Sequence, residues 1–264
     1  MELTFATYNI CACQDFTSYV KDKTLTTCIA NTANVINCLN ADVIGLNEVY
    51  EYFSEREESC KQAQKLAKLC NAKDFTFGLG AAYDWDGSVG VVGNAILSKH
   101  KIVKVEKFPV LSPRKWERDP NEPDQYENRI VIKATVDVDG NEINVLCTHF
   151  GLVPSEQRLM LATLQEILDG DDRPCVLMGD FNAAPHSAVL QPLYDRLQSA
   201  ADVVGKTDEP TFSSFNPNCT LDYIFFSKHF RVKEFEVQDI VLSDHRPVKA
   251  VVEFNENKKT NGNI

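Results

Sequence analysis

Apolar and polar residues alternate in short runs at the start of the chain, which predicts strands separated by helices. Residues 3–10 alternate over their whole length and predict a first strand that ends near Asn9. Between about 22 and 40, apolar residues recur every three or four positions, the spacing of one helix face. Residues 42–49 then form a short apolar run that Glu48 interrupts. The chain therefore begins with a strand, a helix and a second strand.

The same patterns continue through the middle of the chain. A charged segment from 54 to 70 predicts another helix, and residues 83–87, which are aromatic and acidic, predict a loop between two strands. These strands and a third one that follows are expected at 75–80, 89–99 and 101–110. The turn signal Asp139-Gly140-Asn141 lies between two alternating runs and predicts a hairpin of residues 129–138 and 141–148.

The last part of the chain adds one long helix and several strands. Pro154 begins a helix that Gly170 ends. An apolar strand at 175–177 runs into Gly179-Asp180-Phe181-Asn182, and a looser helical region reaches about Asp202. Three more strands are expected at 220–227, 230–237 and 249–254.

No repeat or linker divides these elements, so residues 1–254 are expected to form one domain. The order of strands and helices predicts an α/β (α+β) architecture in which two mixed sheets pack face to face with helices outside. The polar tail, residues 255–264, is expected to be disordered.

Composition narrows the classes of protein that fit. No apolar run approaches the roughly 20 residues of a membrane helix. A net charge of -11 argues against strong sequence-independent binding to nucleic acid. The first ten residues lack the basic segment of a signal peptide, and the nine cysteines contain no C-x-x-C pair, so we expect a monomeric cytoplasmic protein with reduced cysteines. Secretion after removal of a leader is the alternative.

Polar residues interrupt or follow the apolar strands, and each has an ordinary structural interpretation. Glu48 could be an exposed strand end, His149 a hydrogen-bonded structural residue, and the segment from Asp180 to Asn182 a turn. If these acidic and histidine side chains were only structural, however, each would need its own hydrogen-bond partner or contact with water inside the protein. Together they predict a metal and phosphate site, whose residues are Asn9, Glu48, His149, Asp180, Asn182, Asp222, Asp244 and His245.

Six short motifs, in their order along the chain, resemble those of the endonuclease/exonuclease/phosphatase superfamily. They are Tyr8-Asn9-Ile10, Leu46-Asn47-Glu48-Val49, Thr148-His149-Phe150, Gly179-Asp180-Phe181-Asn182, Leu221-Asp222-Tyr223-Ile224-Phe225 and Ser243-Asp244-His245-Arg246-Pro247. The superfamily contains nucleases, sphingomyelinases, inositol polyphosphate phosphatases and deadenylases, and the resemblance runs from about residue 3 to 254. It implies a four-layered α/β/β/α sandwich that hydrolyses a phosphoester with Mg²⁺ or Mn²⁺.

The resemblance also implies a role for each residue of the site. Glu48 would be the principal metal ligand, with Asn9 and Asp244 near it, and an oxygen-rich set of this kind suits Mg²⁺. The remaining residues would handle the phosphate and the attacking water. His149 would hold a phosphate oxygen, Asp180 would orient or deprotonate the water, Asn182 would position both, and His245, oriented by Asp222, would stabilise charge or activate water.

Further residues are candidate substrate contacts. Arg129 and Asn94 lie in segments that resemble those of the superfamily, and Arg129 could contact phosphate or form a structural salt bridge. The proline-rich, charged loop at 112–124 places Trp116 beside several basic residues, where it could meet an anionic substrate.

The favoured function is a phosphodiesterase in which water attacks phosphorus, and three alternatives stay open. One is a nuclease that acts on specific DNA or RNA ends, and another is an activity like that of a sphingomyelinase or inositol phosphatase. The acidic pI weighs against a nonspecific nuclease, and the absence of an apolar hairpin or a basic amphipathic helix weighs against a membrane-inserting sphingomyelinase. The third alternative is a catalytically silent binding module, but no motif residue is lost.

Overall fold

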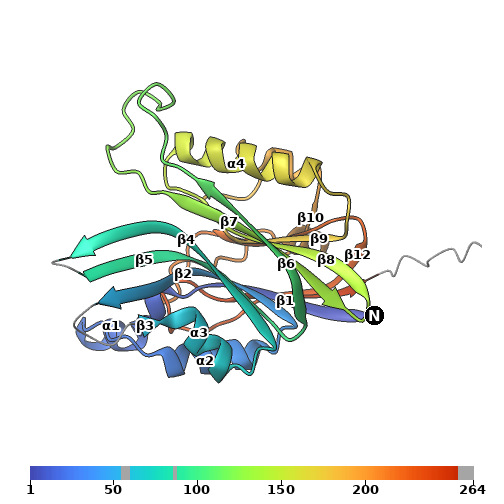
Figure 1. The fold of residues 1–264 in the computed structure, drawn as a ribbon, viewed down its shortest axis with the longest axis horizontal. Helices are drawn as coiled ribbons and strands as arrows, with labels where there is room; N and C mark the ends of the chain where they lie inside the picture. The colour runs from blue at the N-terminus through green and yellow to red at the C-terminus, as the bar shows by residue number, and fades with distance from the viewer. Residues whose placement is uncertain (55–59, 86–87, 255–264) are drawn as a thin grey trace, which may run out of the picture.

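Two mixed β-sheets pack face to face, and helices cover both outer faces (Figure 1). This computed structural model describes residues 1–54, 60–85 and 88–254. The predicted four-layered α/β/β/α arrangement is confirmed. The predicted tail at 255–264 lies outside the described residues.

The first sheet contains the strand that starts the chain and the strand that ends the described part of it. Its order is β12-β13-β1-β2-β5-β4, with β3 paired to β2. Only the β1–β2 pair is parallel. The bounds are β1 Glu2–Asn9, β2 Val43–Ser54, β3 Cys60–Lys61, β4 Asp74–Trp85, β5 Ser88–Ser98, β12 Phe230–Val237 and β13 Val248–Phe254.

The second sheet is built from the middle of the chain and has the order β10-β11-β9-β8-β7-β6. Its only parallel pair is β8–β9, and the long helix α4 (Pro154–Asp169) connects these two strands. The bounds are β6 Lys101–Val110, β7 Arg129–Val138, β8 Asn141–His149, β9 Cys175–Asp180, β10 Gln198–Ser199 and β11 Asp222–Phe226.

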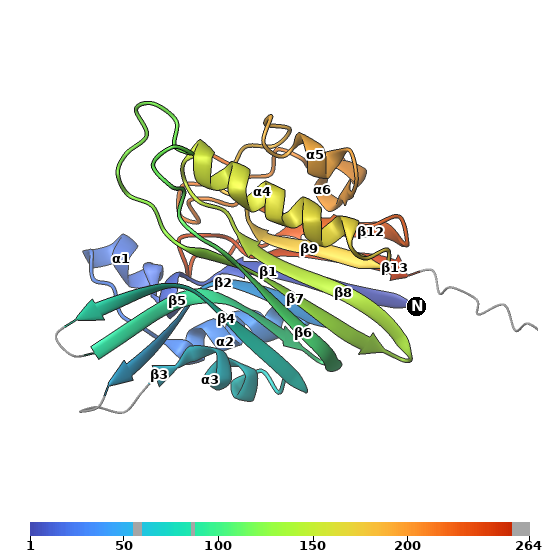
Figure 2. The same ribbon diagram turned by 45° about the horizontal axis from the view of Figure 1, so that its top comes forward.

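The helices form the outer layers. Figure 2 shows α4 along the second sheet, with the short α5 (Gln191–Tyr194) and α6 (Ala200–Val203) on the same side. The first sheet is covered by α2 (Ile29–Leu39) and α3 (Gln62–Leu69). A further helix α1 (Phe16–Asp22) and the single turn η1 (Cys11–Cys13) follow β1, and no described helix is long and apolar enough to span a membrane.

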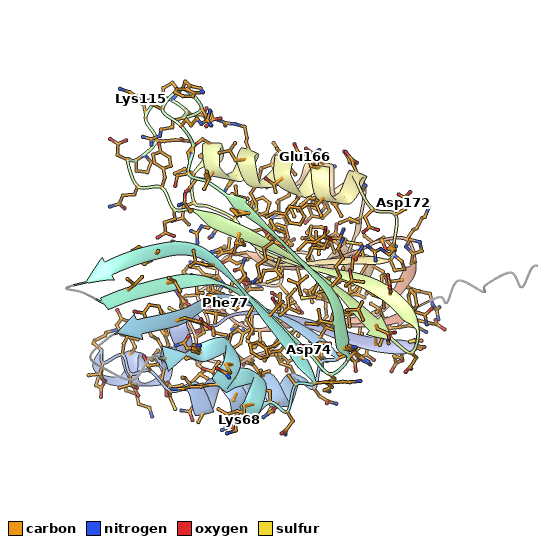
Figure 3. The ribbon with its side chains drawn as sticks, viewed as in Figure 1. Lys68, Asp74, Phe77, Lys115, Glu166 and Asp172 are labelled. Carbon is orange, nitrogen blue, oxygen red and sulfur yellow. The ribbon has the colours of Figure 1, made fainter. Side chains whose placement is uncertain are left out.

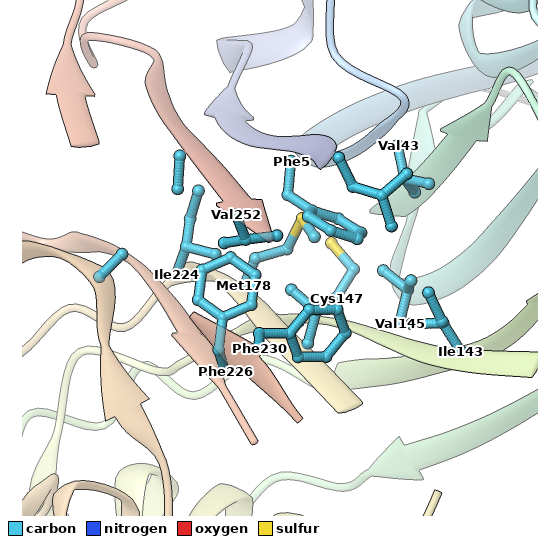
Figure 4. Packing of buried hydrophobic residues seen from close by; sticks show 14 of the residues in the cluster. Phe5, Val43, Ile143, Val145, Cys147, Met178, Ile224, Phe226, Phe230 and Val252 are labelled. Atoms are coloured by element: carbon cyan, nitrogen blue, oxygen red, sulfur yellow. The ribbon is translucent and has the colours of Figure 1, made fainter. Parts of the chain in front are cut away.

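The core between the sheets explains why the strands carry apolar residues on facing sides. Figure 4 shows part of this core, in which Phe5 of β1 meets Phe226 and Phe230 edge to face at centroid distances of 5.7 and 6.1 Å. Two further apolar clusters fill the space between each sheet and its helices. Both faces of the central strands are therefore buried, and polar side chains within them, such as Asn47 and Lys133, need partners inside the protein.

Three predicted boundaries were wrong. The helix expected from about 22 to 40 begins only at Ile29, and the residues before it form a helix that was not predicted, α1, which Lys23 ends in the left-handed conformation (φ 65°). The helix expected from 54 starts at Gln62, and residues 55–59 lie outside the described part. The loop expected at 83–87 is strand as far as Trp85, since cross-strand pairing with β5 continues to Ser88. In the last case the pairing of β4 with β5 determined the structure, although the local sequence is typical of a loop.

The segment between β6 and β7, residues 111–128, is a long loop as predicted, and it packs against the start of α4. Glu122 accepts hydrogen bonds from the backbone N–H of Ser155 (2.8 Å) and from its hydroxyl (2.5 Å), and Arg158 pairs with Asp119 at 2.7 Å. Figure 3 shows Lys115 at the outer end of this loop. Contacts with the helix therefore position the loop although it has no regular structure of its own.

Asp171 stabilises a buried ammonium, and its removal should destabilise the fold. Lys133 is only 7% exposed, and its Nζ lies 2.7 Å from Asp171 but 3.6 Å from its second partner, Glu106. We expect Asp171→Asn to lower the free energy of unfolding by about 2–3 kcal/mol in a urea titration. The exposed neighbour provides the control, since Asp172→Asn should stay within ~0.5 kcal/mol. Equal values for the two variants would contradict this account.

The same interaction sets a pH dependence. Hydrogen bonds from Arg173 and Lys133 hold the pKa of Asp171 well below its ordinary value. An acid with a lowered pKa contributes its full stabilisation above its unfolded pKa of about 3.9, and that contribution is lost as the pH falls below it. The difference between wild type and Asp171→Asn should therefore shrink in acid and not in base.

Candidate active site

A cleft of about 440 Å³ lies at the edge of the sandwich where β8 and β9 end. It is lined by Glu48 and Asp244 on one side and by His149, Asp180 and Asn182 on the other. Six of the eight residues predicted for the site therefore meet there, because His245 also lines it. The other two, Asn9 and Asp222, lie directly behind and contact them.

Sheet pairing brings the catalytic candidates of the second sheet together. In the register of β8 with β9, His149 is the partner of Asp180, and in the register of β9 with β11, Asp180 is the partner of Asp222. Residues that are paired across neighbouring strands project from the same face of the sheet. Three consecutive strands thus deliver a histidine and two carboxylates side by side at one end.

Glu48 reaches the cleft because its strand contains a bulge. The pairing of β2 with β5 is interrupted between Leu46 and Val49, and Glu48 has the left-handed φ of 53°. A bulge leaves one residue unpaired and turns its side chain away from the regular alternation. The strand continues for several residues after Glu48, so the prediction that it ends there was wrong.

Asn47, which precedes Glu48, was not predicted as a site residue. It is fully buried, and its Nδ2 donates to Thr148 O (2.7 Å) and to Asn94 Oδ1 (2.9 Å). Its Oδ1 accepts the backbone N–H of Asp180 at 3.0 Å. One amide of the first sheet therefore binds the ends of both β8 and β9 in the second. An amide directly after the apolar run at 43–46, and inside the predicted strand, was the signal that could have identified it.

Asn9 joins the two halves of the site as a hydrogen-bond donor. Its Nδ2 donates to Glu48 Oε1 (2.9 Å) and to Asp180 Oδ2 (3.0 Å), while its Oδ1 accepts the N–H of Cys11 (3.1 Å). Exchanging nitrogen and oxygen would break all three bonds. The structure therefore places the amide nitrogen of Asn9 toward the carboxylates, not the oxygen that the expected metal ligand would use.

The segment from Asp180 to Asn182 is both a turn and part of the cleft wall. The N–H of Asn182 donates to Asp180 Oδ1 at 3.0 Å, and Asn182 has a φ of 45°. This side-chain turn leads the chain out of β9. It also leaves Asn182 Nδ2 3.0 Å from Phe150 O and 3.2 Å from His149 Nε2. The two interpretations that the sequence left open are therefore compatible.

His149 is held neutral by its neighbours. Arg129 Nη1 lies 3.2 Å from its Nδ1, and because a guanidinium can only donate, Nδ1 must accept. The ring proton is then on Nε2, whose acceptor is Asp180 Oδ2 at 3.5 Å, because the nearer Asn182 Nδ2 at 3.2 Å is itself a donor and cannot accept this proton. Burial, followed by the charges of Arg129 and His245, lowers the pKa of His149 well below its ordinary value. The cleft thus contains an uncharged N–H donor at this point.

His245 lies in the opposite environment, between two buried carboxylates. Its Nδ1 is 2.8 Å from Asp222 Oδ2, and its Nε2 is 3.5 Å from Asp180 Oδ2. Burial disfavours the charged ring, but the charges of Asp222 and Asp180 outweigh this and raise the pKa of His245 to about 10. The site therefore contains one neutral and one protonated histidine at neutral pH.

Asp180 is the shared neighbour of both histidines. It is 1% exposed, and burial is the main reason why its pKa is raised to about 7, with the charge of Asp222 acting in the same direction. The charge of His245 opposes the shift. A carboxylate with a pKa near neutrality can accept a proton and release it again at physiological pH.

Two groups of side chains could hold a metal ion. Glu48 and Asp244 offer carboxylate oxygens to the cleft, and burial together with the charge of Asp244 raises the pKa of Glu48, a repulsion that a cation would relieve. Asp180, Asp222 and His245 have ligand atoms within 4.8 Å of one another. In that second group the imidazolium already bridges the acids. Glu48 and Asp244 therefore fit a hard divalent cation better.

The predicted substrate contacts are placed differently from one another. Arg129 lines the cleft. Asn94 is 2% exposed and uses its amide to bind Asn47 and Ile130 O, so it supports the site from behind. Trp116 is 77% exposed on the loop at 111–128, where Arg114 lies 5.5 Å above its ring, and it does not line the cleft. The lining residues Tyr83, Glu127, Leu152 and Phe212 were not predicted.

Comparison with known proteins agrees with this geometry. A model of the Endonuclease/Exonuclease/phosphatase family matches residues 6–245. The fold is similar to that of an endonuclease/exonuclease/phosphatase from Beutenbergia cavernae, with a TM-score of 0.76 and 23% identity over 96% of this chain and 72% of that one. No curated protein sequence matches the chain.

Two other solved structures share the fold at lower identity. One is a mannosyl-6-phosphatase from Bacteroides thetaiotaomicron, with a TM-score of 0.68 and 18% identity over 96% of this chain and 100% of that one. The other is the human Nocturnin catalytic domain with a bound sulfate anion, with a TM-score of 0.67 and 19% identity over 96% and 94% of the two chains.

Gly179 should tolerate no side chain, because β8 lies against it. A Cβ there would lie 1.9 Å from Thr148 O, and the φ of Gly179 is 145°. We expect Gly179→Ala to lower the free energy of unfolding by more than ~3 kcal/mol or to prevent folding, as judged by urea denaturation. Gly140→Ala is the control, since its φ is also positive (84°) but no atom lies within 4 Å, and it should cost only ~1 kcal/mol. Similar costs at both glycines would show that backbone strain alone matters.

Asp222 should control the protonation of His245. Asp222→Asn keeps an oxygen that can accept from Nδ1 but removes the nearest negative charge, so the pKa of His245 should fall from about 10 toward its ordinary value. NMR titration of the ring C–H signals measures this directly. The exposed Asp208→Asn should leave the His245 titration where it is. An unchanged pKa in Asp222→Asn would mean that another group protonates the ring.

Proposed function

Because the chain belongs to the endonuclease/exonuclease/phosphatase family, we propose that it is a phosphoric ester hydrolase that depends on Mg²⁺ or Mn²⁺, and specifically a phosphodiesterase. The observation that carries the proposal is the position of the Asp180 carboxylate, which has Asn9, His149 and His245 as neighbours and a pKa near neutrality. Such a group is suited to activate water beside a bound phosphate.

Glu48 and Asp244 would hold the metal ion, with Asn9 keeping Glu48 in place. When bound, the ion would polarise a phosphate oxygen and neutralise charge that develops on it. Asn9 also binds Asp180, so a single side chain fixes the distance between the metal ligand and the proposed base. Correct spacing of reacting groups is a large part of catalysis in such sites.

The remaining residues of the site would each act on the phosphate or on the attacking water. His149 Nε2–H would donate to a non-bridging oxygen, and Asn182 would position the water and the phosphate. Asp180 would accept the proton of the attacking water. The protonated His245, held by Asp222, would stabilise the charge of the transition state. Each donor is already oriented by the protein, so little reorganisation is needed.

Other activities are the alternatives to a phosphodiesterase. The similar structures include a mannosyl-6-phosphatase, and a nuclease acting on specific ends or an activity like that of a sphingomyelinase or inositol phosphatase is compatible with the same residues. The sulfate of the Nocturnin domain is a tetrahedral anion like phosphate, which supports an anion as ligand. A catalytically silent binding module is the least supported, because every motif residue is present. A cytoplasmic, monomeric enzyme stays our expectation.

Removing either acid should abolish hydrolysis. We expect Glu48→Gln and Asp180→Asn each to lower kcat/KM for bis-p-nitrophenyl phosphate by about 10²–10⁴ with Mg²⁺ or Mn²⁺, because each removes an ionised group from the reaction. The matched control is Glu253→Gln, whose partner Arg231 lies on an exposed part of the first sheet. Full activity in both site variants would refute the assignment. A panel of single- and double-stranded DNA, RNA and sphingomyelin under the same conditions separates the alternatives.

A further inference from the structure

We propose that Glu127 determines specificity by restricting the cleft to phosphoesters that carry one negative charge and an apolar group beside the phosphorus. The proposal rests on the proposed function and names the substrate class of the same site. It follows from the charges of the cleft, from the bonds of Arg129 and from the position of an apolar wall.

The cleft is acidic for a site that binds an anion. Among its described lining residues, Glu48, Glu127, Asp180 and Asp244 are acids, and Arg129 is the one lysine or arginine. A divalent ion at Glu48 and Asp244 would balance about two of these charges. Arg129 and the imidazolium of His245, which also lines the cleft, offset the other two. A polyphosphate, a polynucleotide or an ester with two charges would therefore find no net positive charge in the cleft to compensate its own.

Glu127 also forms an ion pair with Arg129, the one arginine among the described lining residues of the cleft. Its Oε2 lies 3.0 Å from Arg129 Nη2, while Arg129 Nη1 faces His149 Nδ1 at 3.2 Å. Tyr83 donates its hydroxyl to Glu127 Oε1 at 2.7 Å and so fixes the carboxylate in this orientation. The guanidinium therefore positions His149 and is largely neutralised by Glu127. Little of its charge is left for a second negative charge on the substrate.

Another part of the cleft lining is apolar. Leu152, Phe212 and Leu221 line it, and these three residues are called the apolar wall below. Leu152 is 74% exposed and so is accessible to a ligand in the cleft, and the ring of Phe212 lies 4.9 Å from that of His245. An aryl or alkyl group attached to the phosphate would cover this wall and gain the free energy of apolar burial.

One buried carboxylate binds the backbone of both Glu127 and Leu152. Glu156, which is 5% exposed in the first turn of α4, accepts the backbone N–H of Glu127 (2.8 Å) with Oε1 and that of Leu152 (3.2 Å) with Oε2. The acid and the apolar wall are therefore set at a fixed separation by the same side chain. A cleft of this kind disfavours a second negative charge near Glu127 and favours an apolar group that can cover Leu152.

The test compares three esters at pH 8 with Mg²⁺. Bis-p-nitrophenyl phosphate has one charge and two aryl groups, methyl p-nitrophenyl phosphate has one charge and a small second group, and p-nitrophenyl phosphate carries two charges at this pH. We expect wild type to prefer the first over the last by at least about 10²-fold in kcat/KM, and Glu127→Gln to reduce that preference about tenfold. An amide keeps an acceptor for Tyr83, so the loop should stay in place.

Two further variants serve as controls. One tests whether an acid elsewhere in the loop has the same effect as Glu127, and the other tests whether the apolar wall contributes to binding. Asp124→Asn removes an acid from the same loop at a position where the side chain is 94% exposed, and it should leave the preference unchanged. Leu152→Ala should raise KM about threefold to tenfold for bis-p-nitrophenyl phosphate but not for the methyl ester. Since Leu152 is exposed, this variant should fold normally.

The outcomes distinguish a failure of the proposed function from a failure of the role proposed for Glu127. If wild type hydrolyses none of the three esters with Mg²⁺ or Mn²⁺, the proposed function itself fails. If wild type hydrolyses the esters but prefers p-nitrophenyl phosphate, the proposed function is supported and the proposed specificity is refuted. If Glu127→Gln leaves the preference as it is in wild type, the role of Glu127 is refuted. A KM that Leu152→Ala leaves the same for both diesters refutes the apolar wall.

Discussion

The hydrogen bonds of one buried amide, Asn47, hold the two sheets in the relation on which the site depends. Its three bonds reach β5, the end of β8 and the start of the turn after β9. Hydrophobic packing between the sheets is strong but non-directional, so by itself it would permit small shifts of one sheet over the other. A buried amide must be satisfied by particular partners, and this requirement fixes the alignment of Glu48 with Asp180.

The ionisable side chains of the site lie close together and yet have different protonation states. His149 is neutral because its neighbour can only donate, and His245 is protonated because its neighbours are carboxylates. Asp180 lies between them with a pKa near neutrality. Asp180 lies 3.5 Å from each histidine, and all three groups are buried, so their differences arise from the choice of partners and not from differences in burial. The protonation states in the site are therefore determined by the neighbours of each ring, Arg129 for His149 and Asp222 with Asp180 for His245.

The order of elements and most of the residues of the site could be predicted from the sequence, because strand alternation and strand-end polarity are local patterns. The errors arose where distant contacts decide the structure. Trp85 lies in a strand because β5 pairs with it, although its segment has the composition of a loop. The direction of the Asn9 amide and the role of Glu156 depend on residues far along the chain. The bulge at Glu48 likewise follows from pairing with β5, which no pattern within 42–49 could indicate.

The attachment of the loop at 111–128 has a consequence for how such a protein can change. The loop is fastened to α4 through Glu122, Arg158 and Glu156, and none of these bonds involves the metal side of the cleft. The loop that carries Glu127 is therefore attached to the molecule independently of Glu48 and Asp244, and it reaches the proposed catalytic residues only through the pairing of Glu127 with Arg129. A different loop seated on the same helix turn could redirect the protein to a new ester while Asn9, Glu48 and Asp180 remain as they are.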